Sequence, residues 1–214
     1  MFNSQHQFLD TVISQFDQAL KTLVPGSVTA GRVSPGISKA GAELEQGEQQ
    51  HSAGLMRINH TGEVCAQALY QGQALTARLP VVREQMQQAA NEEVDHLSWC
   101  EDRLEELHSR PSLLNPVWYA MSYGLGAAAG LAGDKWSLGF VAETEHQVCE
   151  HLQDHLHRLP RADEKSRAIL ERMLVDEGRH AIMAENAGAS KLPQPVRQIM
   201  TLMSEIMKKT AYRL

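Results

Sequence analysis

Two Glu-x-x-His pairs, at residues 93–96 and 177–180, constrain the fold of this chain more than any other feature. Positions three apart lie on the same side of an α-helix, so each pair presents a carboxylate and an imidazole together. Two such pairs on two helices, with one Glu from each of two further helices, form the inward-facing two-metal cage of ferritin-like bundles. The chain supplies the further acids as Glu63 and Glu145. We therefore predict an all-α, ferritin-like four-helix bundle.

The positions of the turns place these four acids at similar heights in the bundle. Proline usually marks the end of a helix, so Pro80 and Pro160 separate the two helices of each predicted hairpin. Within each hairpin, the two acids lie 13 to 17 residues from the proline between them. At about 1.5 Å rise per residue, the mismatch in height is roughly 6 Å in the first hairpin and roughly 3 Å in the second. Side-chain reach and loop slack can absorb such differences, so the acids should meet near one plane.

Each acid also lies on an apolar helix face. Around Glu145, for example, Val141, Val148 and Leu152 follow the i, i+3, i+4, i+7 pattern of a bundle helix. A carboxylate on a core face is costly unless it is paired or bound to metal. A single Glu-x-x-His is often a chance feature of a solvated helix, but two pairs with two matched acids favour a metal site. The candidate metal ligands are Glu63, Glu93, His96, Glu145, Glu177 and His180.

The predicted architecture has two parts. Residues 1–48 form an N-terminal amphipathic helix, over 5–23, and a Gly/Pro/Ser-containing linker. Residues 49–214 form the metal-binding domain, with bundle helices over 49–78, 82–109, 134–159 and 162–187 and a last helix over 196–211. A long uncharged crossover joins the two hairpins.

Residues close to the candidate ligands receive different interpretations. Glu92 and Glu143 point away from their neighbouring ligands on a helix and are predicted to be surface charges. Asp176 is a candidate to accept the second N–H of His96, because a metal-bound histidine usually donates that hydrogen to a carboxylate. His60 is predicted to be a polar core group. The remaining histidines are assigned to the surface by default: His6, His51, His108, His146, His151, His155 and His157.

Composition excludes several other classes of protein. The net charge of −6 and the lack of a basic run argue against a nucleic-acid partner. The three cysteines, Cys65, Cys100 and Cys149, are too few and scattered for a disulfide framework or a zinc site. Free thiols and the absence of signal-peptide or transit-peptide features suggest a cytoplasmic bacterial protein.

The crossover, residues 111–133, contains no charged residue. Its length would allow a bilayer span, but two prolines and four glycines weaken that reading. An interfacial segment, with Trp118, Tyr119 and Tyr123 at the level of the lipid headgroups, fits better. An ordinary buried crossover is the other alternative. The last helix is amphipathic and rich in methionine, so it could line an apolar entrance or belong to the core.

Four segments resemble one known family. They are Arg-Ile-Asn-His-Thr-Gly-Glu at 57–63, Glu-Val-Asp-His at 93–96, Val-Ala-Glu-Thr-Glu at 141–145 and Asp-Glu-Gly-Arg-His at 176–180. Together with the Gly-rich stretch before residue 134, they resemble the demethoxyubiquinone hydroxylase family of ubiquinone biosynthesis. The resemblance covers about residues 54–214 and not the N-terminal arm. Glu143, where an apolar residue is expected, and the short end after Tyr212 depart from the family pattern.

The resemblance implies that the six candidate ligands bind two irons per chain, with Glu93 and Glu177 bridging them. It implies hydroxylation of the ring of a polyprenyl 3-methyl-6-methoxy-benzoquinol, demethoxyubiquinol, with O₂ as co-substrate and NADH as the ultimate reductant. A substrate that lives in the bilayer implies an enzyme peripheral to the cytoplasmic face of the bacterial cell membrane. A homo-oligomer or a biosynthetic complex is compatible with this assignment.

The ligand set itself suits iron that binds and reduces dioxygen, because carboxylates and imidazoles leave coordination positions open. Three other classes use or resemble such a bundle. An iron-storage protein would need the same cage but not the uncharged crossover. A radical-generating subunit needs a tyrosine near the metals, and Tyr70, two turns from Glu63, is a distant candidate. A structural adaptor would not explain six metal-type residues on core faces.

Overall fold

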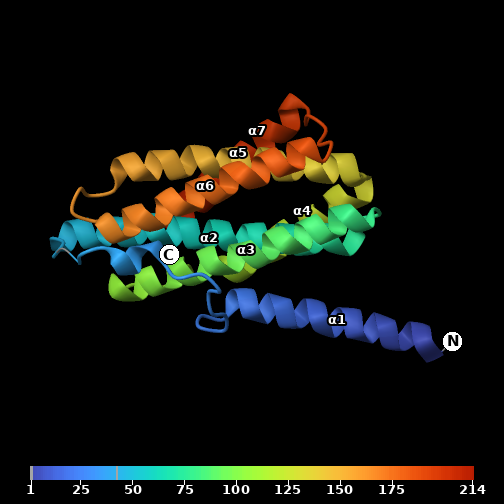
Figure 1. The fold of residues 1–214 in the computed structure, drawn as a ribbon, viewed down its shortest axis with the longest axis horizontal. Coiled ribbons are helices and arrows are strands. Elements are labelled where there is room, and N and C mark those ends of the chain that lie inside the picture. The colour runs from blue at the N-terminus through green and yellow to red at the C-terminus, as the bar shows by residue number, and fades with distance from the viewer. Residues whose placement is uncertain (1, 42) are drawn as a thin grey trace.

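Four long helices form a bundle, as the sequence predicts (Figure 1). The computed structural model describes residues 2–41 and 43–214. The bundle helices are α2 (Gln46–Thr76), α3 (Pro80–Glu106), α5 (Asp134–Arg158) and α6 (Glu164–Asn186). Within the described residues there is no strand, so the all-α prediction is confirmed. In the view of Figure 1, the α5–α6 hairpin lies above the α2–α3 hairpin.

Capping interactions set the helix ends, which differ from the predicted ends by a few residues. At the start of α2, Glu45 and Glu48 form a capping box, so the helix begins at residue 46 rather than 49. Pro80 occupies the first turn of α3, where its missing N–H costs nothing. The Asp163 side chain accepts a hydrogen bond from the Ser166 N–H at the start of α6.

The apolar core lies on both sides of the level at which the candidate ligands meet. In α2, Met56 belongs to one buried cluster and Tyr70 to another, and Glu63 lies between them. In α3, Ala89 and Cys100 have the same relation to Glu93 and His96. The polar residues are therefore enclosed by apolar layers above and below, which keeps bulk water away from them.

The crossover forms a helix, α4 (Asn115–Ala132), that packs along α2. Close approach of the two backbones requires glycine: a Cβ on Gly72 would lie 2.3 Å from the Tyr123 carbonyl oxygen, and one on Gly126 would lie 2.2 Å from that of Leu69. Among the described residues, no helix combines the length and apolarity needed to cross a membrane.

The placement of two aromatic residues of α4 at the level of lipid headgroups is wrong. Trp118 is 8% exposed and Tyr119 is 7% exposed, because both side chains face α2 and the bundle. The exposed side of the crossover instead carries aliphatic side chains that recur every four residues, one helical turn apart. They are Leu113, Val117, Met121 and Leu125.

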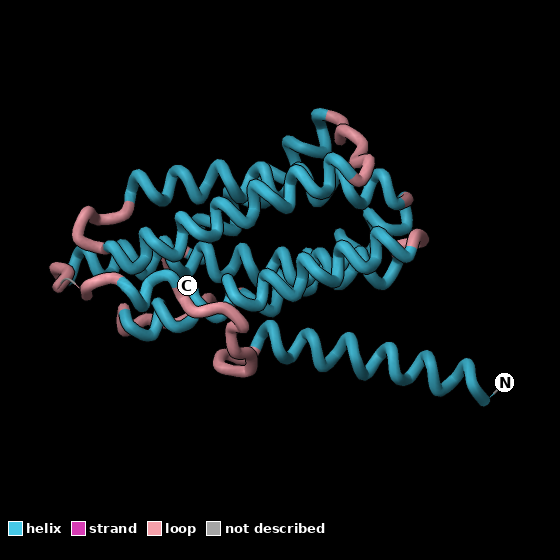
Figure 2. Tube along the Cα trace, viewed as in Figure 1, coloured by secondary structure: helices cyan, strands magenta, loops and turns pink. Residues whose placement is uncertain are grey.

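The terminal segments attach differently to the bundle. Helix α1 (Phe2–Leu23) contacts α2 and α4, for example through Gln15 and Tyr123, and its N-terminal end extends beyond the bundle (Figure 2). Its residues Ile13 and Phe16 are exposed. The linker that follows runs over α3 and contains one short 3-10 helix, η1 (Pro35–Ser38). Helix α7 (Gln194–Ala211) lies against α2 and α5. Beyond it, the Tyr212 hydroxyl lies 2.7 Å from His51 Nδ1, at one end of α2.

Candidate metal centre

The structure brings all six candidate ligands together in the middle of the bundle. They form two groups whose ligand atoms lie within 4.8 Å of one another, and every member is buried. One group contains Glu63 and His96, and the other contains Glu145 and His180. Glu93 and Glu177 belong to both groups. The arrangement therefore has two potential cation positions with two carboxylates between them.

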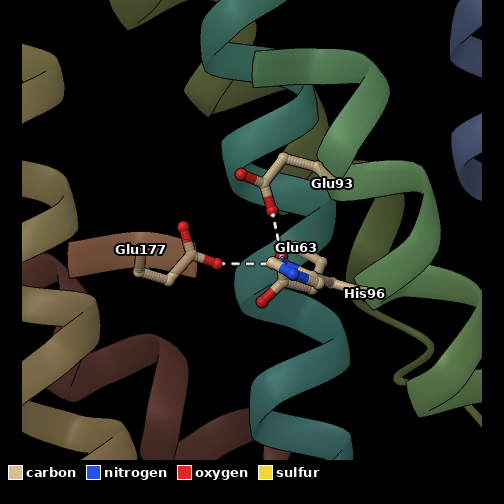
Figure 3. Close-up of side chains that lie close together, drawn as sticks. All are labelled: Glu63, Glu93, His96 and Glu177. Carbon is tan, nitrogen blue, oxygen red and sulfur yellow. Dashed lines mark hydrogen bonds and ion pairs between the residues drawn. The ribbon is translucent and has the colours of Figure 1, made fainter. Parts of the chain in front are cut away.

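Each histidine turns its Nδ1 atom toward the carboxylates, as Figure 3 shows for His96. The His96 Nδ1 atom lies 3.0 Å from Glu177, 3.1 Å from Glu93 and 3.6 Å from Glu63. The His180 Nδ1 atom lies 3.0 Å from Glu177 and 3.2 Å from Glu93. A ring nitrogen carries at most one hydrogen, so it cannot satisfy two or three carboxylates at once. One cation in each group could contact all of these carboxylates at once.

Three carboxylate oxygens of the cluster lack a hydrogen bond. Glu63 Oε2, Glu93 Oε1 and Glu177 Oε1 are buried without such a partner. An unsatisfied buried acceptor costs on the order of 1–3 kcal/mol, and more when it is charged. Oxygen and nitrogen donors of this kind are the ligands that iron and similar divalent metals accept. The donor set and its unsatisfied atoms therefore fit metal ions.

The pKa values of the cluster reflect burial and mutual repulsion. Burial, followed by repulsion from Glu93, raises the pKa of Glu63 well above its usual value. Burial and repulsion from Glu177 raise the pKa of Glu145 in the same way. Burial opposes protonation of His180, but hydrogen bonds to Glu177 and Glu93 raise its pKa to about 12. Without cations, the cluster retains protons that metal binding would displace.

The second ring nitrogen of each histidine, Nε2, pairs with an acid on the opposite helix. His96 Nε2 donates to Asp176 Oδ2 at 3.1 Å, and His180 Nε2 donates to Glu92 Oε2 at 2.9 Å. Each of these acids immediately precedes the Glu-x-x-His pair on the opposite helix. The prediction for Asp176 is confirmed, and the reading of Glu92 as a surface charge is wrong. Glu92 does point away from Glu93, but that direction faces α6, which the helical angle alone does not reveal.

Tyr70 is closer to the centre than its position in the sequence indicates. Its hydroxyl donates a hydrogen bond to Glu145 Oε1, and the side chain is fully buried. The prediction of a distant residue was wrong because it measured the separation from Glu63 along α2. The partner comes from α5, whose Glu145 reaches across the bundle.

The structure also gives the positions of other residues for which the sequence made a prediction. His60 is a buried polar group, as predicted, between Glu101 and Asn115. Glu143 stays outside the cluster and pairs with Arg197 of α7 at 2.6 Å. The surface assignment of His151 and His155 is wrong, because both are buried.

The two buried histidines extend the inward face of α5. Positions 148, 151 and 155 follow helical spacing from Glu145, which was the signal available in the sequence. Burial lowers the pKa of His151 to about 4 and that of His155 to about 2. Both rings are therefore neutral near pH 7, and His155 Nδ1 lies 2.9 Å from Asn59 Oδ1.

An apolar cavity of about 250 Å³ lies beside the cluster. Its walls come from α2, α4, α5 and α7 and include Gly62 and Thr144, the neighbours of Glu63 and Glu145. Other lining residues are Cys65, Leu69, Trp118, Leu125, Val148 and Met203. The prediction that the Met-rich last helix could line an apolar entrance agrees with this lining. The cavity offers an apolar space whose lining includes chain neighbours of the proposed ligands.

Comparison with known proteins gives a consistent result. Residues 50–211 match the family model described as ubiquinone biosynthesis protein COQ7. The chain is 59% identical over 215 residues to a 3-demethoxyubiquinol 3-hydroxylase of Azotobacter vinelandii, covering 100% of both chains. It is 58% identical to the protein of that name in Pseudomonas putida, covering 96% of each chain. It is also 60% identical to one in Acinetobacter baumannii, covering 96% of this chain and 97% of the other.

These matches extend further than the four motifs. The alignment with the Azotobacter protein includes the N-terminal arm, which the motif resemblance left out. The sequence match, the all-α bundle and the buried Glu and His cluster lead to the same assignment. This chain therefore belongs to the COQ7 family of ubiquinone biosynthesis proteins.

Proposed function

We propose that this protein is a di-iron monooxygenase that hydroxylates the ring of demethoxyubiquinol in ubiquinone biosynthesis. The names of the relatives, 3-demethoxyubiquinol 3-hydroxylase, support the reaction. The observation that carries the proposal is the pair of buried ligand groups that share two glutamates and lie beside an apolar cavity.

The six residues would hold two irons, one in each group. Glu93 and Glu177 would bridge them, since only these two belong to both groups. Iron with open coordination positions supplies the binding and reduction of O₂ that hydroxylation requires. The chain contributes the rest: the apolar layers and the cavity exclude water, and Asp176 and Glu92 fix the orientation of the histidines.

The cavity is the proposed site for the quinol ring. Its apolar walls suit a methylated, methoxylated ring, and its lining includes Gly62 and Thr144, the chain neighbours of Glu63 and Glu145. Met121 and Leu125 belong both to the cavity wall and to the exposed stripe of α4. A polyprenyl tail could follow this stripe toward a bilayer. We therefore propose a peripheral position on the cytoplasmic membrane face. From the family resemblance, we also propose NADH as the ultimate reductant.

Iron content and product formation test the proposal together. Purified protein should contain about two irons per chain and convert a short-tailed demethoxyubiquinol to its hydroxylated product in the presence of O₂ and a reductant. Glu145→Ala and His180→Ala should abolish conversion and lower the iron content, whereas the matched control Glu143→Ala should change neither. An inactive Glu143→Ala with an active Glu145→Ala would refute the assigned ligands.

The same measurement separates the rival functions. An iron-storage protein would accumulate many irons per chain, and a structural adaptor would hold none. A radical-generating subunit would hold two irons but show a tyrosyl radical, for which Tyr70 is the candidate because it donates to Glu145. Turnover of the quinol without such a radical would leave the hydroxylase assignment.

The membrane position has its own test. Leu113 is 62% exposed and Val117 is 54% exposed, and neither lines the cavity. Replacing both with Asp would place charges where insertion is proposed, at a cost of about 2–3 kcal/mol each. The variant should keep its iron, leave the membrane fraction and still convert a short-tailed analogue in water. Equal loss of activity on long-tailed and short-tailed substrates would contradict the membrane assignment.

A further inference from the structure

The linker after α1 reaches the metal centre through one arginine. Arg32 Nη1 lies 2.7 Å from Asp176 Oδ2 on α6, and Arg32 Nε donates to Asp95 Oδ2 on α3. Asp95 and Asp176 directly precede His96 and Glu177, respectively, in the chain. One guanidinium therefore connects the two helices that carry the Glu-x-x-His pairs, at the level of the centre.

Arg32 is held in place by several contacts. The backbone N–H groups of Gly31 and Arg32 both donate to Asp95 Oδ1, at 2.6 and 3.3 Å. The guanidinium lies 4.9 Å from the centre of the Trp99 ring, and Trp99 Nε1 donates to the Arg32 carbonyl. The same indole packs against the His96 ring, with 5.4 Å between ring centres. A fixed position of this kind suits orientation of a neighbour rather than a solvated surface charge.

Asp176 has two other arginine partners, and one of them, Arg179, also reaches α3 by pairing with Glu92 at 2.6 Å. Arg172 and Arg179 both pair with Asp176 from within α6, and their side chains are about half exposed. Among the arginines that pair with Asp176, Arg32 is the one that also contacts α3 through Asp95. Removing it would leave Asp176 paired with His96, Arg172 and Arg179, but would break the link between Asp176 and Asp95.

Among the residues that the structure describes, the second ligand group has no comparable contact from the linker. His180 donates to Glu92, and Glu92 pairs with Arg179 at 2.6 Å, so this arrangement involves α3 and α6 alone. The linker contact thus affects the group of Glu63, Glu93, His96 and Glu177 more directly than the other. The two proposed metal positions should therefore respond differently to loss of the linker contact.

We propose that Arg32 is a positioning residue that fixes His96 for metal binding by bridging Asp95 and Asp176. This assignment rests on the two-metal centre proposed above. It adds the N-terminal linker to the machinery of the site. Loss of the bridge weakens metal binding at the His96 position and leaves binding at the His180 position intact.

Anaerobic titration of the metal-free full chain with Co²⁺ tests this assignment, because Co²⁺ absorption reports each occupied position. Wild type should bind two ions. Arg32→Gln should bind one ion as wild type does and the other about 10–100-fold more weakly, the usual effect of losing an outer contact of a metal ligand. Arg32→Lys should be intermediate, because an ammonium group cannot reproduce the planar fork.

Arg103→Gln is the matched control. Arg103 also joins α3 to the start of α6, through Asp163 at 2.8 Å and Ser166 at 2.9 Å, but away from the centre. This variant should lower the melting temperature and keep both Co²⁺ affinities.

The outcomes separate the two proposals. Wild type that binds no metal would refute the proposed centre. The role of Arg32 would be overturned if Arg32→Gln bound both Co²⁺ ions as tightly as wild type does. It would also be overturned if Arg32→Gln and Arg103→Gln weakened both sites to the same extent.

Discussion

The two halves of the candidate metal centre share a local pattern and differ in their surroundings. In each half, a histidine turns Nδ1 toward Glu93 and Glu177 and donates Nε2–H to an acid on the opposite helix. The acid behind His96, Asp176, has a side chain that is 1% exposed and tied to the linker. The acid behind His180, Glu92, is 23% exposed. The same motif therefore has an enclosed supporting acid in one half and a partly exposed one in the other.

The largest expected effect comes from the shared ligands. Glu177→Ala removes a carboxylate from both groups, so it should reduce metal binding at both positions and abolish hydroxylation. His96→Ala removes a ligand from one group and should leave one metal position occupied. Metal analysis and Co²⁺ titration of both variants measure this difference. Equal metal loss in both variants would show that the two positions are not separable.

The acids behind the histidines should give a smaller and unequal effect. Asp176→Asn keeps the shape of the side chain but weakens a buried acceptor with several charged partners. Glu92→Gln changes a partly exposed acceptor with fewer partners. We expect roughly 10–100-fold weaker metal binding for Asp176→Asn, and a smaller loss for Glu92→Gln. The reverse order would show that enclosure does not control the strength of the two positions.

Removal of the metals should change how stability depends on pH. The folded-state pKa values of Glu63, Glu145 and His180 are raised, so these groups hold protons that the unfolded chain releases earlier. Their contribution to stability is present at low pH and is lost as the pH rises. The metal-free protein should therefore lose stability as the pH rises above 6.5, the ordinary pKa of histidine, whereas the metal-bound protein should not, since deprotonation favours metal binding.

Thermal or denaturant unfolding across this pH range measures the effect. Glu63→Gln should raise the melting temperature of the metal-free protein at pH 8, because it removes the burial cost of a charged carboxylate and its repulsion from Glu93. Equal melting temperatures with and without metal at pH 8 would argue against a buried cation site.

Much of the fold and the inner cluster could be predicted from the sequence. The i, i+3 spacing of Glu93 and His96 and of Glu177 and His180 depends only on helix geometry. The heights of Glu63 and Glu145 depend on residue counts from the helix ends and on a constant rise. Hairpins with short turns leave few alternatives for the packing of four such helices. For these reasons, local pattern was sufficient to bring the six residues together.

The surroundings of the cluster could not be predicted in the same way. Helical angles state where Glu92, Trp118 and His155 point relative to their own helix, but not which neighbour lies there. Trp118 faces α2 because Gly72 and Gly126 allow the two helices to approach closely. Contacts that depend on the neighbouring helix require the packed structure.

The sequence by itself therefore determined the four bundle helices, the six residues of the buried cluster and the family to which the chain belongs. Only the tertiary structure decided which acid supports each histidine, that Tyr70 reaches Glu145, and that Arg32 lies beside Asp176, 144 residues away in the chain. The physical reason is the distance along the chain between the residues that interact. Periodicity and spacing report interactions within a helix or a hairpin, whereas the path of an irregular linker follows from many weak contacts that leave no period in the sequence.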